Sequence, residues 1–406
     1  MGLLRARART SPEAPSQADD RSRDFPALGP DDVYLDAACQ SLRPDAVRRA
    51  MRAYDTEYPA CGGRAAYAWA TRVEREVDEV RRRALDRFGL SPRRFSCAFT
   101  LNTTYALNLL QQQLPVGRYA RVVTTHTEHN AVFLSTITAA RRLGVPRLVI
   151  ERSPDGRLDL SGVDLTDAVV VISAMDNVTG TPTQGLSDLV AAAHARGGIV
   201  LVDAAQAAPH DTAALRGLGA DALCFSAHKM SGPALGVALV AHDLLQSLDI
   251  SFLGGGQVAT VRGDAPELLP DLHTRLEPGL QAWGEIIGFG AALDWLGAQG
   301  AALPERERTL GARLYDGLSQ VPHLRMFSPA ASTVVSAIPE RVDAHRLAVF
   351  LSHAGVAARS GHFCAHHWLS EREGLPPLIR FSVGPHSSEH DIDRALEIVG
   401  RMLRGL

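Results

Sequence analysis

The sequence lacks any apolar run that approaches the roughly 20 residues needed to span a bilayer. It also lacks an excess of charge of either sign, since 42 Lys and Arg face 45 Asp and Glu for a formal net charge of −3. A nearly balanced charge provides no electrostatic attraction for nucleic acid or anionic lipid. We therefore expect a protein with no membrane span and no nucleic-acid partner.

Cysteine is scarce as well. The five cysteines are scattered, odd in number and without paired spacing, which argues against a disulfide framework and suits a reducing compartment. The first residues contain arginines but no apolar run long enough for a signal peptide. We expect a cytoplasmic protein whose residues 1–30 form a disordered leader.

Short apolar, β-rich runs alternate with helical patterns from about residue 95 to residue 245. Each run is apolar on both faces, as is typical of strands between two layers of helices. The expected strands occupy residues 96–100, 120–125, 147–151, 168–173, 198–203, 221–226 and 235–241. This alternation predicts an α/β fold with a mainly parallel, doubly wound sheet.

The pattern changes after residue 283. Helices are expected at 283–298, 305–319 and 343–354, with strands in between, and Ser388 and Asp391 resemble a capping box that opens a final helix. We predict a large α/β domain over residues 31–290. A small C-terminal α+β domain over residues 291–406 carries the loop around Cys364.

Lys229 and Asp203 are the most informative pair in the chain. Asp203 ends one buried strand and Lys229 follows the next, so both fall at the carboxyl ends of strands, where ligands bind in open α/β sheets. A lysine there could form a Schiff base, and an aspartate could pair with a pyridinium nitrogen, which is the arrangement that pyridoxal 5'-phosphate requires. The alternative is a solvated loop lysine beside an ordinary strand-end aspartate.

Further polar residues follow the other expected strands. Thr103 and Thr104 stand at a strand-to-helix junction, which suits an anion, although threonine is also a routine N-cap. His129 could stack on an aromatic cofactor or serve only a structural role. Polar residues with further candidate contacts to the cofactor are Asn177, Ser226 and His228.

Five stretches carry a resemblance to a known family: VDAAQ, FSAHKMSGPALG, NVTGT, GGGQVATV and RSGHFCAHH. In order and spacing they resemble the class V, fold-type I pyridoxal-phosphate enzymes. Within that class they are similar to the cysteine desulfurases of the sulfur-mobilisation and selenocysteine-lyase-like branch. The resemblance runs from about Tyr34 to the C-terminus.

The resemblance implies a role for each matching residue. Lys229 would be the Schiff-base lysine and Cys364 the sulfur acceptor, with His129 stacked on the cofactor ring as a third catalytic residue. The remaining cofactor contacts would come from Thr103, Thr104, Asn177, Asp203, Gln206, Ser226 and His228. The substrate carboxylate would bind Asn177 and Arg380, with Arg359 close by and Arg64 lining the entrance.

The implied activity is removal of sulfur from L-cysteine, which yields L-alanine and a persulfide on Cys364 for iron-sulfur cluster assembly or other sulfur-containing biosynthesis. The implied partners are a sulfur-acceptor or scaffold protein and a second copy of the chain in a homodimer. The alternatives are a class V aminotransferase, an epimerase, a selenocysteine lyase or a non-catalytic protein that binds the cofactor.

The chain departs from the family pattern at four places. Tyr105 replaces an acidic residue after the paired threonines, Tyr67 replaces a histidine of the entrance segment, and Leu280 replaces a threonine that reaches the partner subunit. The stretch 384–391 lacks an asparagine before the last helix. These departures concern substrate preference and contacts between subunits, and the catalytic residues are retained.

The histidines around Cys364 raise the alternative of a zinc site. Their one- and two-residue spacings are tighter than structural zinc patterns, and no second Cys/His pair lies nearby in the sequence. We therefore predict no metal. His366, His367 and Trp368 lie just beyond Cys364, where contacts with the sulfur acceptor are expected. Cys97 and Cys224 fall in apolar strands and are expected to be structural.

Overall fold

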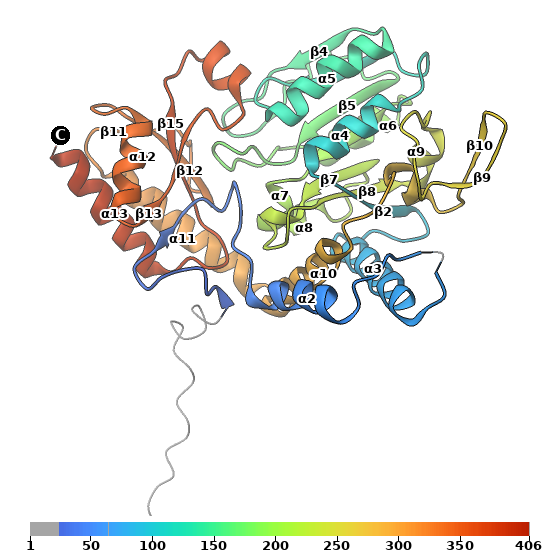
Figure 1. Cartoon of the computed structure of the whole chain (residues 1–406). Helices are drawn as coiled ribbons and strands as arrows, with labels where there is room; N and C mark the ends of the chain where they lie inside the picture. Colours follow the sequence, from blue (N-terminus) through green and yellow to red (C-terminus); the bar gives the residue numbers. More distant parts are fainter. Residues whose placement is uncertain (1–23, 64, 406) are drawn as a thin grey trace, which may run out of the picture.

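The seven apolar runs form one seven-stranded sheet in a computed structural model that describes residues 24–63 and 65–405 (Figure 1). Its order is β2-β8-β7-β6-β5-β3-β4, and only β8 runs antiparallel to its neighbours. The mainly parallel sheet is thus confirmed. The strands are β2 (Phe95–Thr100), β3 (Arg121–Thr125), β4 (Arg147–Ile150), β5 (Ala168–Ser173), β6 (Ile199–Asp203), β7 (Ala222–Ser226) and β8 (Gly236–Ala241).

Helices cover both faces of this sheet, because its strands are apolar on both sides. In β5, Val169 and Val171 face one hydrophobic core while Val170 and Ile172 face the other. One layer contains α4 (Thr103–Gln112), α5 (Asn130–Leu143) and α9 (His242–Ser247). The opposite layer contains α2 (Asp45–Glu57), α3 (Ala68–Arg87), α6 (Leu186–His194), α7 (Ala207–His210), α8 (Thr212–Leu215) and α10 (Trp283–Gln299).

A second, antiparallel sheet lies in the C-terminal part of the chain, in the order β11-β12-β15-β14. Three helices pack their apolar residues against it in a separate core. The expected capping box of the last helix is present. The strands are β11 (Leu324–Met326), β12 (Val334–Pro339), β14 (Arg359–Gly361) and β15 (Leu378–Ser382), and the helices are α11 (Ala302–Ser319), α12 (Ala344–His353) and α13 (Glu389–Arg404).

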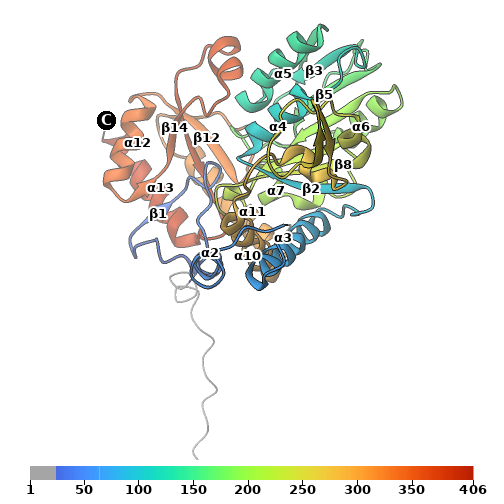
Figure 2. The same cartoon turned by 45° about the vertical axis from the view of Figure 1, so that its right-hand side comes forward.

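The N-terminal segment of the described chain crosses from the small sheet to the large one. Strand β1 (Val33–Tyr34) pairs with β13 (Val356–Ala357), and Asp36 forms a β-bridge with Ser382. A few residues later, Ser41 N donates to the carbonyl oxygen of His228 beside the large sheet. The blue segment accordingly runs between the two sheets in Figures 1 and 2. It forms one wall of the cavity described below.

Several elements were not expected from the sequence. They include β1, α2, β13, β14, the exposed hairpin of β9 (Val258–Arg262) and β10 (Ala265–Leu268), the 3-10 turns η1 (Ala227–Lys229) and η2 (Leu272–Leu276), and the π-helix η3 (His367–Arg372). The hairpin strands are short and carry charged residues, so they lack a clear apolar alternation. Residues 1–23 of the expected leader lie outside the described residues. Arg64, which was expected to line the entrance, also lies outside them.

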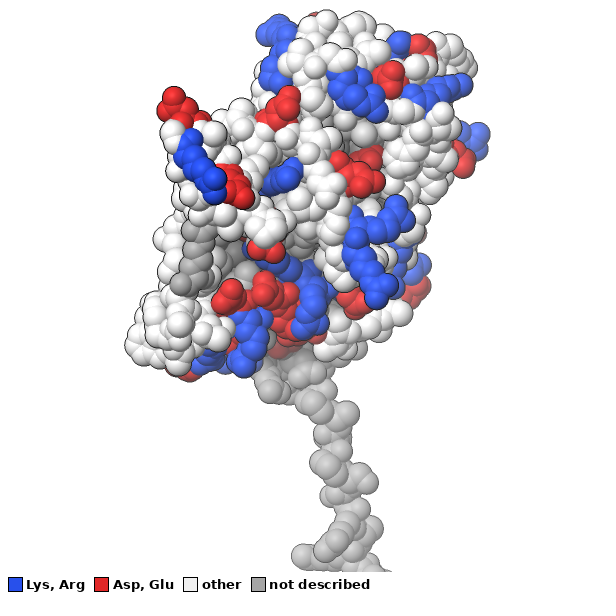
Figure 3. All heavy atoms as spheres, turned by 90° about the vertical axis from the view of Figure 1, so that its right-hand side faces the viewer, with Lys and Arg blue, Asp and Glu red and all other residues white. Residues whose placement is uncertain are grey.

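The surface charge is mixed. On the face shown in Figure 3, acidic and basic side chains are interspersed, without an extended region of one sign. Among the described residues no single helix is long and apolar enough to cross a membrane; α10 and α11 reach that length only as a pair, bent by 80°.

Candidate active site

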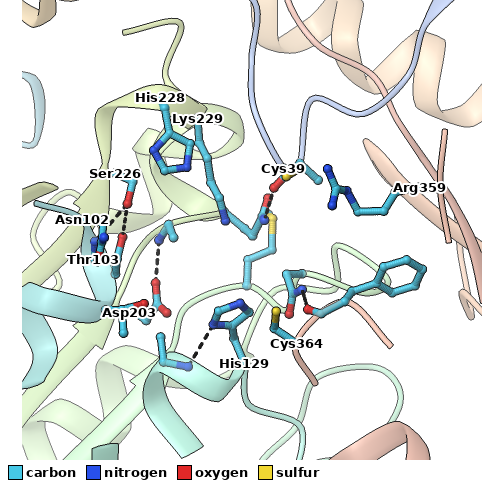
Figure 4. Close-up of a pocket in the computed structure, with 18 of the residues that line it drawn as sticks. Cys39, Asn102, Thr103, His129, Asp203, Ser226, His228, Lys229, Arg359 and Cys364 are labelled. Carbon is cyan, nitrogen blue, oxygen red and sulfur yellow. Dashed lines mark hydrogen bonds between the residues drawn. The ribbon is translucent and has the colours of Figure 1, made fainter. Parts of the chain in front are cut away.

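A cavity of about 300 Å³ lies at the carboxyl ends of the parallel strands, as the strand-end residues predicted (Figure 4). The loops after the strands of the large sheet form one side. The N-terminal segment and the loop of Cys364 form the other. All the described residues that sequence reasoning assigned to the site line this cavity: Thr103, Thr104, His129, Asn177, Asp203, Gln206, Ser226, His228, Lys229, Arg359, Cys364 and Arg380.

Lys229 and Asp203 lie in the same cavity and influence each other electrostatically. Strand β6 ends at Asp203, and Lys229 ends the short turn η1 that follows β7. Burial lowers the pKa of Lys229, and the nearby Asp203 partly offsets this by favouring the charged amine. Burial also raises the pKa of Asp203, against the backbone N–H of Ala205 at 2.9 Å and the charge of Lys229. The lysine therefore has more neutral amine available than an exposed lysine would have.

Lys229 is also the only lysine in the sequence, since the other basic residues counted with it are all arginine. A guanidinium stays protonated in proteins and does not serve as an amine nucleophile. Lys229 is therefore the single side chain of this protein that can condense with an aldehyde.

One corner of the cavity is suited to a phosphate. Asn102, rather than a threonine, is the N-cap of α4, and its side chain accepts from Tyr105 N at 2.9 Å. The hydroxyl oxygen of Ser226 accepts from the backbone N–H of Thr103 at 3.0 Å and lies 2.6 Å from the Thr103 hydroxyl. Hydroxyls and backbone N–H groups thus converge at a helix N-terminus, which favours an anion.

His129 is held in a neutral form. Its Nδ1 accepts from Ala131 N at 3.0 Å as the N-cap of α5, which leaves the proton on Nε2. Burial and the nearby Lys229 lower the pKa of His129 to about 3. A neutral ring costs less to bury and can lie against an aromatic cofactor. Burial and Lys229 similarly lower the pKa of His228 to about 4.

Glu128, next to His129, is a buried acid that the sequence analysis did not identify. Its carboxyl group accepts from the Thr125 hydroxyl at 2.8 Å and from the backbone N–H of Ser173 at 3.0 Å. Burial nevertheless raises the pKa of Glu128 to about 7. Glu128 therefore links the ends of β3 and β5, and the loops after these strands supply His129 and Asn177 to the cavity.

Asn177 is positioned by a second residue that was missed, Asp176. The buried carboxylate of Asp176 accepts from three backbone N–H groups, those of Val178, Thr179 and Thr181, at 2.7 to 3.1 Å. This ring of hydrogen bonds fixes the loop after β5. Asn177 then donates from its side chain to the carbonyl oxygen of Phe363 at 2.7 Å.

The two arginines meet at Asp36, which the sequence analysis also missed. Arg359 donates to both carboxylate oxygens of Asp36 at 2.8 to 3.1 Å, and Arg380 lies 3.4 Å from one of them. The guanidinium of Arg380 is buried and also donates to the carbonyl oxygen of Asn177 at 2.8 Å. Burial lowers the pKa of Arg380, while Asp36 favours its charge. Asp36 therefore contacts both guanidinium groups at once. A second carboxylate could bind to the same pair of arginines.

Cys364 is an exposed residue in the turn between β14 and η3. Phe363 and Cys364 both have positive φ values, 49° and 58°, which is unusual for residues other than glycine. Asn177 holds the carbonyl of Phe363, and Asn130 N donates to the carbonyl oxygen of Cys364 at 2.6 Å. These contacts keep the turn at the cavity while its thiol remains accessible.

The histidines near Cys364 make contacts in different directions. The Nε2 atom of His362 lies 3.1 Å from the carbonyl oxygen of Leu375, and His366 is hydrogen-bonded to the Asn130 side chain at 3.1 Å. His367 stacks on Phe133, with ring centroids 4.1 Å apart. No group of three or more metal-ligating side chains occurs in the described part of the chain.

The expectation that Trp368 contacts a sulfur acceptor was wrong. Trp368 is 8 % exposed and belongs to a small hydrophobic core that anchors the Cys364 loop, with Phe363, Ala365 and Leu369. The apolar ring surface of tryptophan favours burial in that core. His366, by contrast, is exposed.

The cavity contains buried polar atoms without hydrogen-bond partners, and pyridoxal phosphate is a ligand that could supply those partners. Three such atoms are buried in its lining: Oε1 of Gln206, Oδ1 of Asn177 and Nε of Arg380. Buried polar atoms normally have hydrogen-bond partners, so these atoms indicate a polar ligand. The phosphate corner, the single amine and the buried Asp203 match the phosphate, aldehyde and ring nitrogen of this cofactor.

Comparisons with known proteins agree with this geometry. The model of the aminotransferase class-V family matches residues 33–395. A cysteine desulfurase of Klebsiella pneumoniae subsp. pneumoniae is 31 % identical over 386 residues, covering 91 % of this chain and 94 % of the relative. A probable cysteine desulfurase of Mycobacterium leprae is 31 % identical over 94 % of this chain and 95 % of its own. The solved structure of a cysteine desulfurase from Thermococcus onnurineus NA1 has a TM-score of 0.87 and 27 % identity, covering 96 % of this chain and 98 % of that one.

The single lysine leads to a test of cofactor attachment. After incubation with pyridoxal phosphate and reduction with borohydride, mass spectrometry should find the cofactor on one side chain, Lys229. Lys229→Arg keeps the positive charge but removes the amine, so labelling of the side chain should be lost. Equal labelling of both proteins, at the N-terminal amine alone, would contradict the assignment.

Glu128 predicts a pH dependence of stability. Its pKa of about 7 exceeds the ordinary value of 4.5, so the folded protein binds more protons than the unfolded chain between these pH values. The free energy of unfolding should therefore fall as pH rises through this window, by up to about 3 kcal/mol from this group. Glu128→Gln should remove that decrease in urea titrations at about pH 5 and pH 8, whereas the exposed control Glu267→Gln should retain it. Parallel pH profiles for Glu128→Gln and the parent protein would exclude this assignment.

Proposed function

This chain belongs to the class-V aminotransferase family, and from that membership we propose that it is a pyridoxal-phosphate-dependent cysteine desulfurase. It removes sulfur from L-cysteine, releases L-alanine and leaves a persulfide on Cys364. One observation carries the proposal: a single cavity contains the only lysine, a buried aspartate, a buried arginine and an accessible cysteine on a loop. An aminotransferase or epimerase would not need that cysteine.

Residues of the large sheet would hold the cofactor. Lys229 would bind its aldehyde, Asp203 its ring nitrogen and Gln206 its ring hydroxyl, and His129 would lie against the ring. The phosphate would bind in the corner made by Thr103, Thr104, Ser226 and His228. When bound, pyridoxal phosphate supplies an electron sink for the negative charge that develops on the substrate carbon next to the carboxylate.

The arginines would bind the substrate carboxylate. Arg380 has one buried nitrogen without a hydrogen-bond partner, and Arg359 is partly exposed beside it. Asp36 orients both guanidinium groups before substrate arrives. The free side-chain oxygen of Asn177 is an acceptor, so it would receive a hydrogen bond from a donor of the bound molecule rather than contact the carboxylate. Two fixed cations favour an α-amino acid over an amine without a carboxylate.

The protein's own residues then move a proton and a sulfur atom. The amine of Lys229, with its lowered pKa, accepts the proton from the substrate α-carbon. The Cys364 thiolate attacks the substrate sulfur; the new S–S bond forms as the bond from sulfur to the β-carbon breaks. That electron pair stays with the carbon, which becomes the methyl group of alanine after protonation. The exposed turn lets Cys364 pass the sulfur to an acceptor.

We place the activity in the cytoplasm, as the source of sulfur for a sulfur-acceptor or scaffold protein in iron-sulfur cluster assembly or related biosynthesis. The five cysteines are all free, which suits a reducing compartment. Residues 31–290 would act as the cofactor-binding domain and residues 291–406 as the domain that carries the Cys364 loop.

We further propose a homodimer that forms through an apolar surface around Leu280. Leu280 is 78 % exposed, and Phe252 and Leu253 are also exposed large hydrophobic residues. The segment around Gly255 packs against this region, since Gly279 N donates to the Gly255 carbonyl at 2.7 Å. Neighbouring exposed apolar residues of this kind favour a protein partner.

Replacing the sulfur-accepting cysteine tests the proposed reaction. Cys364→Ser should reduce alanine formation from cysteine by roughly a hundredfold or more, because the hydroxyl is a far weaker nucleophile toward sulfur. Cofactor absorbance should remain. The control Cys61→Ser changes an exposed cysteine outside the cavity lining and should leave the rate unchanged. Full alanine formation by Cys364→Ser would instead support a lyase that does not use this thiol.

A charge at the apolar surface tests the dimer. Leu280→Glu would have to bury a carboxylate between subunits, which should weaken association on the order of 100-fold. Sedimentation velocity should then show monomer at concentrations where the parent protein is dimeric. Val349→Glu, on α12, is the matched control at another exposed apolar residue. A parent protein that is itself monomeric, or a dimer unaffected by Leu280→Glu, would refute this interface.

A further inference from the structure

The cavity contains a second thiol that the proposed reaction does not use. Cys39 lines the same cavity as Cys364, although the two residues are far apart in sequence. Figure 4 shows Cys39 beside Arg359 and Cys364 beside His129, with both thiols facing the cavity. The other cysteines are placed differently: Cys97 and Cys224 are buried in strands, and Cys61 does not line the cavity. Two of the five thiols therefore line the same cavity.

Cationic side chains surround Cys39 in the cavity. Lys229, Arg359 and Arg380 all line the cavity that Cys39 lines. Arg380 is 3 % exposed and has a buried Nε without a partner. A persulfide carried by Cys39 would therefore lie among positively charged side chains.

The two thiols differ in exposure and in how they are held. Cys39 is only partly exposed, and its backbone N–H donates to the Asp36 carbonyl at 3.1 Å in a tight turn. Cys364 is exposed, on the turn with two successive positive φ values. In a sulfur transfer the moving atom lies between the two Sγ atoms, so they need not approach as closely as in a disulfide.

We propose that Cys39 is a second sulfur-carrying residue, which takes the outer sulfur of the persulfide from Cys364. This proposal rests on the desulfurase function. The Cys39 thiolate attacks the outer sulfur; the S–S bond to Cys364 breaks as a new S–S bond to Cys39 forms. Cys364 leaves as a thiolate and receives the proton that Cys39 lost. The exchange has no net oxidation or reduction and needs no further reactant.

A transfer to Cys39 has a functional consequence. It restores the Cys364 thiol while the sulfur remains in the cavity, so a second cysteine can react before an acceptor arrives. Each subunit can then hold two sulfur atoms, one on a partly sheltered thiol and one on the exposed loop.

The test maps sulfur onto individual cysteines. Trypsin cleaves after Lys and Arg, which places Cys39, Cys61 and Cys364 in separate peptides. Holoenzyme is exposed to excess L-cysteine without reductant, desalted, alkylated, digested and analysed by mass spectrometry. We expect one added sulfur on the Cys364 peptide and one on the Cys39 peptide, with none on the internal control, Cys61. Cys39→Ser should hold one sulfur per subunit instead of two, and Cys364→Ser none.

Other outcomes would overturn the transfer in distinguishable ways. Sulfur on Cys364 but never on Cys39 would refute the transfer and leave the desulfurase function intact. Sulfur on Cys39 in Cys364→Ser would show that it arrives without passing through Cys364. A disulfide between the two cysteines would show that Cys39 discharges the persulfide rather than storing it. Sulfur on neither residue would refute both the transfer and the proposed function.

Discussion

The buried guanidinium of Arg380 is the charge on which the arrangement of the cavity depends. Removing a cation from water costs several kcal/mol unless oppositely charged and polar groups surround it. Here those groups come from distant parts of the chain: Asp36 from the N-terminal segment and the carbonyl of Asn177 from the loop after β5. Arg380 itself stands on β15 of the small sheet. One charge therefore connects both sheets and the segment between them at the cavity.

The buried guanidinium of Arg380 also contacts the Cys364 loop. The guanidinium of Arg380 lies over the ring of Phe363 at 4.7 Å, and Asn177, whose carbonyl binds Arg380, holds the carbonyl of Phe363. A non-glycine residue with positive φ costs on the order of 1 kcal/mol and persists only where its surroundings compensate. The loop meets this condition through its buried Phe363 and Trp368. The backbone beside Cys364 is thus fixed by packing while the sulfur stays open to solvent.

Local pattern in the sequence was enough for the large sheet and for the residues at its strand ends. Lys229, Asp203 and Thr103 follow apolar runs directly, so the parallel sheet brings them together. Asp36 could not be assigned in this way, because its contact with Arg359 joins residues 323 positions apart. Glu128 and Asp176 were missed for a related reason: their importance lies in burial and in hydrogen bonds across loops. Their one local signal is an acidic residue directly beside a predicted site residue.

Composition and geometry together determine where an aldehyde can react. All the other residues in the Lys and Arg count are arginine, whose guanidinium remains charged over the range in which proteins fold. The one lysine lies in a cavity that lowers its pKa, so its neutral amine is more available than that of an exposed lysine. Asp203 opposes this effect and retains part of the charge. The neutral amine of Lys229 can therefore bind an aldehyde and can accept a proton. The proposed reaction requires both of these steps, one after the other.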